Sequence, residues 1–182
     1  LTVLAAFFAI AIVVAYNRLV RSRNRVDAAW SDIDVQLQRR YDLVPQLVEA
    51  VKHYGSYERA TLDAVAELRA EAMRRTGVGE RGDAEDKLGE SLGRLIALAE
   101  SYPDLKANRN FLELQAELVE TEDYLQFARR YYNGSVRDYN TLVEIVPVNL
   151  VASSFGFGGR EFFQKASDDV ANVPNLDLGS VE

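Results

Sequence analysis

The side chains that could do chemistry in this sequence of 182 residues are few, and most of them are carboxylates. There is no cysteine, and the single histidine, His53, has Glu49 one helical turn before it. A Glu and a His at this spacing can form half of a metal pair, but a two-metal centre in a helical bundle needs two Glu-x-x-His elements on facing helices. We therefore expect His53 to be an exposed ring near a helix end, and we predict no catalytic residue, no bound metal, no cofactor and no enzymatic activity.

A ladder of carboxylates is formed by Glu113, Glu117 and Glu120, whose spacings of four and three residues place them on one face of a helix. Such a ladder can bind Mg²⁺ or Ca²⁺, but the interpretation we favour is a solvated helix face. A third alternative is pairing with Arg39 or Arg40, near the middle of the first predicted helix. Contacts of this kind would fix the register of two helices more than they would stabilise the fold.

Trp30 lies among three acidic residues, Asp27, Asp32 and Asp34. This pattern favours a polar face around a tryptophan that packs in the core or along a helix seam. The alternative is an interface used in self-assembly, and Trp30 is therefore a candidate interface residue.

The elements that position these residues begin with an apolar run from Leu1 to Ala15, in which Thr2 is the only polar residue. At about 1.5 Å per residue the run covers roughly 22 Å of a hydrocarbon layer about 30 Å thick, and we expect a few residues before Leu1 to complete the span. No Gly or Pro separates the run from the Arg-rich segment 16–25. This join predicts a membrane helix that continues into a helical domain, with a signal peptide or a buried core helix as the alternatives.

Charge predicts the orientation of this anchor, because Arg18, Arg21, Arg23 and Arg25 follow it with no acidic residue among them. Lys and Arg favour the cytoplasmic side and attract anionic lipids, so we expect these four residues to contact lipid headgroups and the rest of the chain to be cytoplasmic. The formal net charge of the chain is −7. An acidic domain lacks the basic surface that nucleic-acid binding needs, and no nucleic-acid partner is expected.

The periodicity of apolar residues predicts two long helices. The first extends from the membrane to about Tyr54, and Pro45 within it predicts a kink near Tyr41 to Asp42 rather than an end. The second begins in a capping box at Asn110 and continues to Val146, before Pro147. Apolar positions at spacings of three, four and seven residues in the first helix also fit the seam of a coiled coil.

Two shorter helices are predicted between the long ones, over residues 56–75 and 84–100, and the segment 76–83 with its three glycines predicts an exposed loop. The most economical fold is all-α, in which an N-terminal transmembrane helix continues into a long antiparallel bundle of about four helices. The predicted domains are the transmembrane anchor 1–17, the cytoplasmic helical bundle 18–147 and the C-terminal tail 148–182.

The tail is rich in aromatic residues and glycine. Its sequence GFGG at 156–159 lacks the Lys-Ser or Lys-Thr of a nucleotide-binding loop, and no predicted strand precedes it. We expect a short segment that folds back on the bundle, with docking to another subunit, another protein or the membrane face as the alternative. The predicted docking residues are Phe155, Phe157, Phe162 and Phe163.

Several motifs in this chain resemble the signature of the bacterial LemA family. The resemblance extends from the anchor to about Phe163. The motifs are Tyr16-Asn17-x-Leu19-Val20, Arg23-Asn24-Arg25-Val26-Asp27-x-Ala29-Trp30-Ser31-Asp32-Ile33-Asp34-Val35-Gln36-Leu37-x-Arg39-Arg40, Asp42-Leu43-Val44-Pro45-x-Leu47-Val48, Tyr102-Pro103-Asp104-Leu105-Lys106-Ala107-Asn108, Phe111-x-x-Leu114-Gln115-x-Glu117-Leu118, Ala128-Arg129-x-x-Tyr132-Asn133 and Phe155-Gly156-Phe157.

The resemblance implies a single-span bacterial membrane protein with an α-helical cytoplasmic domain, in a family with no established catalytic activity. Family members are often linked with envelope maintenance and with membrane-bound metalloproteases, which is an argument by analogy. We therefore expect a homo-oligomeric scaffold at the cytoplasmic face of the bacterial inner membrane, with a role in envelope organisation or maintenance. The alternative is an adaptor that binds a membrane metalloprotease or another envelope protein.

Overall fold

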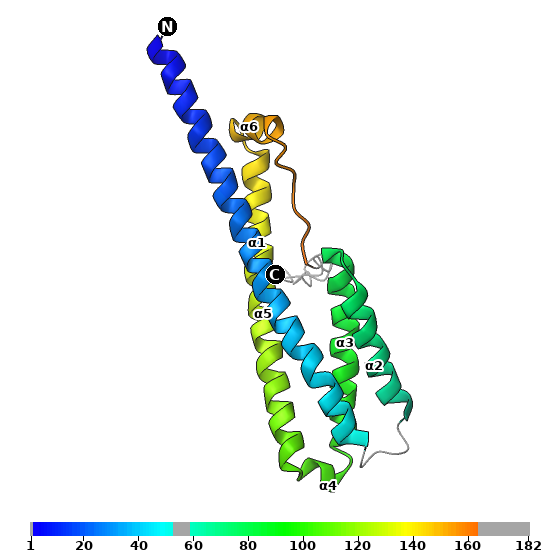
Figure 1. The fold of residues 1–182 in the computed structure, drawn as a ribbon. Helices are drawn as coiled ribbons and strands as arrows, with labels where there is room; N and C mark the ends of the chain where they lie inside the picture. The colour runs from blue at the N-terminus through cyan, green and yellow to red at the C-terminus, as the bar shows by residue number, and fades with distance from the viewer. Residues whose placement is uncertain (1, 53–58, 164–182) are drawn as a thin grey trace, which may run out of the picture.

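The computed structural model describes residues 2–52 and 59–163, and its regular secondary structure over these residues is α-helical. The longest helix, α1 (Thr2–Lys52), contains the apolar N-terminal run and continues into the bundle without a break. It passes through Pro45, which therefore does not end the helix. Figure 1 shows the N-terminal part of α1 projecting beyond the other helices.

The other helices build a bundle on the second part of α1. The long helix α5 (Arg109–Glu144) packs antiparallel along α1, and α2 (Arg59–Arg74) and α3 (Val78–Ala99) form a pair beside them (Figure 1). The short α4 (Pro103–Lys106) leads from α3 into α5, and α6 (Val148–Ser154) turns across the far end of α5. The predicted all-α fold is confirmed, and within the described residues two further short helices, α4 and α6, accompany the four predicted ones.

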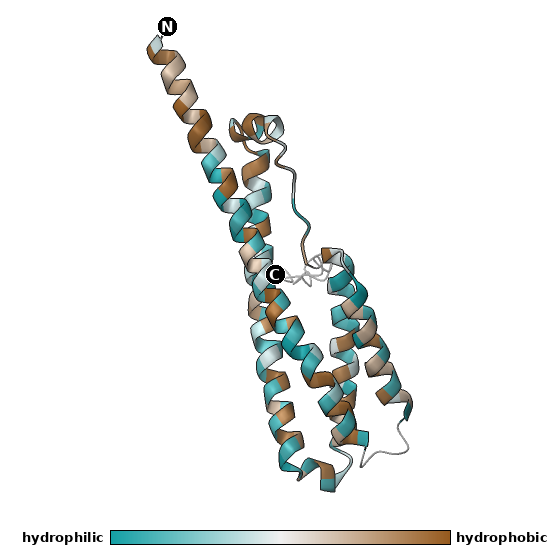
Figure 2. Cartoon of the chain, viewed as in Figure 1, coloured by the Kyte–Doolittle hydropathy of each residue, from teal (hydrophilic) through white to brown (hydrophobic). Residues whose placement is uncertain are grey.

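One apolar core joins the helices, and no residue of α1 before Leu19 is buried in it. From Leu19 to Leu37 the buried residues of α1 recur at spacings of three, four and seven, as predicted, and from Arg40 to Val51 they follow one another more closely. Figure 2 shows the contrast between the brown N-terminal part of α1 and the mixed colours of the bundle. The apolar side chains that α1 buries are Leu19, Val26, Ala29, Ile33, Leu37, Tyr41, Leu43, Val44, Leu47 and Val51.

The prediction of an exposed loop over residues 76–83 is wrong, because α3 begins at Val78. A glycine in a helix costs about 1 kcal/mol relative to alanine, which is why the local sequence favoured a loop. Tertiary contacts outweigh this cost. Gly82 is buried, and Arg81 donates a hydrogen bond of 2.7 Å to Asp34 on α1.

The predicted capping box at the start of α5 is also wrong, because the helix is capped by Asn108 rather than Asn110. The side chain of Asn108 accepts a hydrogen bond of 3.2 Å from the backbone N–H of Phe111. Asn108 has the extended backbone that an N-cap needs, whereas Asn110 already belongs to the first turn. The predicted end of the first helix at Tyr54 lies outside the described residues.

The chain after α6 folds back on the bundle, as predicted. We call residues 155–163 the strap. Gly156 has φ of +72°, a conformation that glycine adopts without strain and that turns the chain away from α6. Asn140 on α5 exchanges two hydrogen bonds with the Arg160 backbone, at 2.9 and 2.8 Å, and Tyr132 donates one of 2.9 Å to the carbonyl of Glu161. The strap therefore returns from the end of α5 toward the start of α3 (Figure 1).

Candidate functional site

Four side chains meet between α1, α3 and α5: Arg40, Tyr41 and Glu85 are buried, and Glu122 at their edge is one-third exposed. We call these four residues the buried polar cluster. Arg40 is buried, with its Nε 3.0 Å from Oε1 of Glu122 and its Nη1 3.5 Å from Oε2 of Glu85. Its Nη2 donates a hydrogen bond of 3.1 Å to the backbone carbonyl of Glu85, and the Tyr41 hydroxyl donates to the Glu85 carboxylate. Pairing with a glutamate of α5, one of the alternatives left open by the sequence, is observed for Arg40, and the partner is Glu122 rather than a residue of the ladder.

Burial is the main influence on the pKa values of Glu85 and Tyr41. It raises the pKa of Glu85, and the hydrogen bond from Tyr41 and the positive charge of Arg40 offset that shift only in part. Burial also raises the pKa of Tyr41, with a further increase from its hydrogen bond to Glu85, so the hydroxyl stays protonated as a donor. Gly89 makes room for the guanidinium, because a Cβ there would lie 3.0 Å from Nη2 of Arg40.

Two further arginines extend the polar contacts from α3 and α5. Arg81 pairs with Asp34 at 2.7 Å, and its guanidinium lies 5.6 Å from the centre of the Trp30 ring. Arg129 on α5 pairs with Asp86 on α3 at 2.8 Å and is itself buried. These contacts tie α3 to both long helices. Trp30 thus lies beside a cation, Arg81, of this same chain.

Phe163 at the end of the strap fills the site between Trp30 and Arg129. Its side chain is fully buried, with its ring centre 5.8 Å from that of Trp30 and 4.9 Å from the Arg129 guanidinium carbon. Its backbone N–H donates a hydrogen bond of 3.0 Å to the side chain of Asn133, and Tyr132 packs edge-on against Trp30 at 5.4 Å. Trp30 is therefore used in the packing of the bundle and strap.

The other predicted docking residues divide into two kinds. Phe157 is buried, with its ring centre 5.6 Å from that of Tyr16. Phe155 also contacts Tyr16, at 5.0 Å between ring centres, but it is more than half exposed, and Phe162 is exposed as well. Of the four phenylalanines, only Phe157 and Phe163 dock fully on this chain.

Three of the four predicted headgroup arginines line one hollow of about 490 Å³ between α1 and α5. Arg23 lies elsewhere, with its guanidinium 5.3 Å from the centre of the Phe157 ring. The three arginines of the hollow are mostly surrounded by small polar side chains, and Asp138 supplies one opposite charge. The hollow is lined by Arg18, Arg21, Ser22, Arg25, Asp138, Thr141 and Leu142.

The remaining acidic candidates lie on the surface. The ladder on α5 is exposed, and its first member, Glu113, pairs with Arg109 at 2.9 Å. Asp27 pairs with Arg160 of the strap at 2.9 Å. No group of three or more His, Cys, Asp or Glu side chains within the described part of the chain could hold a metal ion, and His53 lies outside that part.

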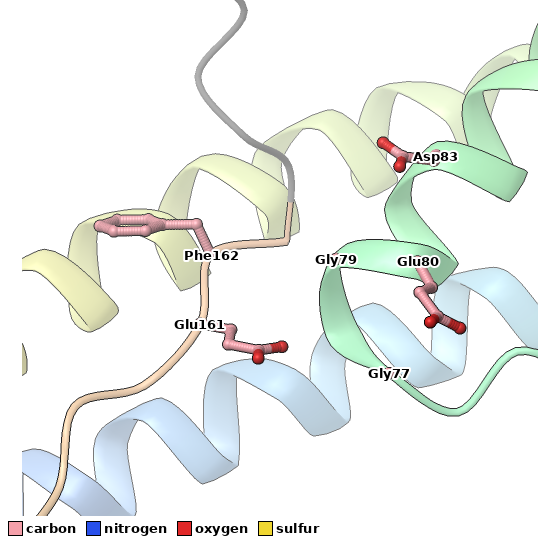
Figure 3. A pocket seen from close by; sticks show the side chains of 6 residues that line it. All are labelled: Gly77, Gly79, Glu80, Asp83, Glu161 and Phe162. Carbon is pink, nitrogen blue, oxygen red and sulfur yellow. The ribbon is translucent and has the colours of Figure 1, made fainter.

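A second hollow, of about 550 Å³, lies between the start of α3 and the strap. Figure 3 shows three carboxylates around it, from Glu80, Asp83 and Glu161, together with the ring of Phe162 and the backbone of Gly77 and Gly79. Every charged residue that the structure describes in the lining of this hollow is acidic.

Sequence reasoning missed the roles of Glu85, Arg81 and Arg129. A signal for Glu85 was present, because it lies three residues before Leu88 and seven before Leu92, on the apolar stripe of α3. A charged residue on a buried stripe indicates an ion pair, since an unpaired buried charge is very costly.

The fold and site define a class of protein in which a helical bundle is carried on one projecting apolar helix. That helix is long and apolar enough to cross a membrane. A family model described as LemA family matches residues 29–177, and the chain belongs to this family.

Named relatives agree with this assignment. The chain is 28% identical to magnetosome protein MamQ 2 of Paramagnetospirillum magneticum, over 93% of this chain and 72% of the relative. It is 25% identical to MamQ of Magnetospirillum gryphiswaldense over the same shares of the two chains, and 25% identical to protein LemA of Metamycoplasma hominis over 89% of this chain and 74% of the relative. Together with the apolar helix, the family indicates a membrane-associated protein of the bacterial envelope.

Proposed function

We propose that this protein is a non-enzymatic scaffold, anchored in the bacterial inner membrane by α1, whose copies assemble side by side at the cytoplasmic face in envelope organisation or maintenance. The orientation rests on Arg18, Arg21, Arg23 and Arg25, since positive charge beside a membrane helix favours the cytoplasm. The non-enzymatic assignment draws support from the buried polar cluster, whose groups pair with one another.

The observation that carries the proposal is an exposed aromatic face on α1 and α5. Val35, Tyr124, Phe127 and Tyr131 are each at least half exposed, and they border a shallow hollow of about 400 Å³. On α5 these residues follow spacings of three and four, so they form one stripe. Contiguous exposed apolar patches are often interaction sites, and this supports assembly through the aromatic face.

A second copy of this chain is the occupant we assign to this aromatic face. Two copies anchored in one membrane stand side by side in the same orientation, so a two-fold axis along the membrane normal would set α1 of each copy against α5 of the other. Asp32 lines the hollow together with Tyr131, and Arg130 stacks on Phe127 at 4.8 Å. The same symmetry sets Asp32 of each copy toward Arg130 of the other, so the face is complementary to itself in charge.

One observation favours the alternative function, an adaptor for a membrane metalloprotease or another envelope protein. The acidic hollow at Glu80, Asp83 and Glu161 is suited to a basic segment of a partner. An adaptor of this kind needs no self-association. The mass of the particle therefore separates the two functions.

The test is the protein mass of the full chain in mild detergent, measured by light scattering with the detergent contribution subtracted. We expect a defined oligomer for the wild type, a shift to monomer for Tyr124→Ala/Phe127→Ala, and no change for Met73→Ala, an exposed apolar control on α2. Asp32→Lys and Arg130→Asp should each weaken assembly, and the double variant should restore it. A wild-type monomer would overturn the scaffold and favour the adaptor.

A further inference from the structure

A second apolar surface lies at the end of the bundle from which the N-terminal part of α1 projects. Val146, Leu150 and Phe155 are 78%, 64% and 57% exposed. They belong to α6 and its two flanks, whereas Val148 and Ala152 on the other side of α6 are buried against the bundle. The short helix thus packs one apolar face inward and leaves another uncovered.

The height of this surface is fixed by Tyr16. The ring of Phe155 lies 5.0 Å from that of Tyr16, in an edge-on contact, and Phe157 contacts the same ring from the strap. Tyr16 directly follows the apolar run that ends at Ala15. Since tyrosine is enriched where a membrane helix leaves the hydrocarbon layer, Tyr16 and Phe155 both fall at the level of the interface.

The charges just beyond Tyr16 match a lipid surface. Arg18, Arg21 and Arg25 lie within about two and a half turns after it and converge on the hollow that Asp138 shares, leaving an excess of two positive charges. Arginine pairs with phosphate oxygens in a bidentate fork, and hydroxyl groups of Ser22 and Thr141 in the lining add further donors. The hollow therefore has the chemistry of a site for an anionic headgroup.

We propose that Val146, Leu150 and Phe155 form a membrane foot, which inserts into the same leaflet from which α1 emerges while the arginine hollow beside it holds an anionic lipid headgroup. The proposal rests on the membrane anchoring in the proposed function, and it adds a second attachment point. The occupant is lipid because the foot continues the apolar surface of α1 and because the adjacent charge is positive. Short apolar elements of this kind bury a few ångströms into the headgroup and acyl boundary.

The chain has no cysteine, so single-cysteine variants of the full protein carry one fluorescent label each. The label is NBD, the protein is reconstituted in phosphatidylcholine vesicles containing phosphatidylglycerol, and quenching is measured with lipids spin-labelled at a shallow acyl position. We compare Leu150→Cys in the foot with Met73→Cys on α2 and with Phe8→Cys in the apolar run. The shallow quencher should reduce the Leu150 signal strongly and leave the Met73 signal unchanged.

The Phe8 label separates the failure of this proposal from failure of the anchor. Quenching at Phe8 by a deep acyl quencher, with the Leu150 label behaving like the Met73 label, would refute the foot and leave the anchor intact. An emission that is blue-shifted at Leu150 but not quenched by lipid would mean a protein occupant, and it would refute the foot as well. No quenching at Phe8 would overturn the anchor and the foot together, and self-assembly is measured separately by particle mass.

The headgroup site is tested by a separate measurement. We compare how strongly spin-labelled phosphatidylglycerol and spin-labelled phosphatidylcholine quench the label at Leu150, and stronger quenching by phosphatidylglycerol indicates a preference for the anionic lipid. One cation near an anionic surface changes binding by about fivefold, so the triple variant Arg18→Gln/Arg21→Gln/Arg25→Gln should lose most of the preference. The matched control replaces three exposed arginines of α2 and α3, namely Arg59, Arg74 and Arg94, and should retain it. An equal loss in both variants would show only a diffuse charge effect and would refute a site at the hollow.

Discussion

Loss of the Arg40 charge should strongly destabilise the bundle, because Arg40 is buried and paired with Glu85. In Arg40→Met the apolar stem remains, but the buried Glu85 loses the cation that lies 3.5 Å away. Breaking a buried ion pair by removing one partner costs about 3–5 kcal/mol, because the other charge is left uncompensated. Glu122 is one-third exposed and can turn toward water, so we assign most of this cost to Glu85.

The cost should depend on pH with a defined sign. The folded-state pKa of Glu85 is raised above its unfolded value, so its contribution to stability is fully present below the unfolded pKa and is lost as pH rises through the folded pKa. The charge of Arg40 lowers the folded-state pKa of Glu85, so Arg40→Met raises that pKa further. The pH range over which stability is lost then extends to higher pH. One group contributes at most about 1.4 kcal/mol per pH unit, so the variant should regain up to about 2.7 kcal/mol between pH 7 and pH 5.

The assay is denaturant unfolding of the full chain in mild detergent, followed by fluorescence of Trp30, the only tryptophan. Arg39→Met is the matched control, since Arg39 is an exposed neighbour on the same helix. The double variant Arg40→Met/Glu85→Gln should lose most of the added pH dependence. A penalty for Arg40→Met no larger than that for Arg39→Met, or the same at pH 5 and pH 7, would refute the assignment.

Two other contacts give predictions that the same unfolding assay checks. Phe163→Ala should lower the free energy of unfolding by about 3–5 kcal/mol, because the Phe163 ring is fully buried. The control Phe162→Ala removes an exposed ring and should change the free energy of unfolding by less than about 0.5 kcal/mol. Similar values for the two variants would argue against docking of the strap. Asn108→Ala should cost about 1 kcal/mol through loss of the N-cap, and a larger effect of Asn110→Ala would contradict the observed start of α5.

The projecting helix and the long antiparallel pair were predictable because their signals are local. The apolar run and the recurrence of Leu19, Val26 and Ile33 depend only on residue spacing within one helix. The start of α3 was not predictable in this way. Gly77, Gly79 and Gly82 weaken the helix locally, and what favours it there is the contact of Arg81 with Asp34, which is 47 residues away in sequence.

The candidate site shows the same division between local and tertiary information. An arginine of α1 and a glutamate of α5 could be paired from the antiparallel topology, but the position of Glu85 on α3 requires knowledge of how a third helix packs. The strap depends on single side chains, Asn133 and Asn140, that bind its backbone. Such contacts have no periodicity, so sequence patterns could predict that the tail folds back but not where it binds.

The continuous α1 links the two proposed surfaces through a fixed geometry. At about 1.5 Å per residue, Asp32 on the aromatic face lies roughly 24 Å along the helix from Tyr16 at the interface. The strap binds α1 near Tyr16 and Trp30, so α6 keeps its height relative to that helix. Two copies in one membrane would therefore present Phe127 at the same height and in the same orientation before they meet. Anchoring has then already removed much of the translational and rotational freedom that association would otherwise cost. A small aromatic face can therefore suffice for assembly in the membrane.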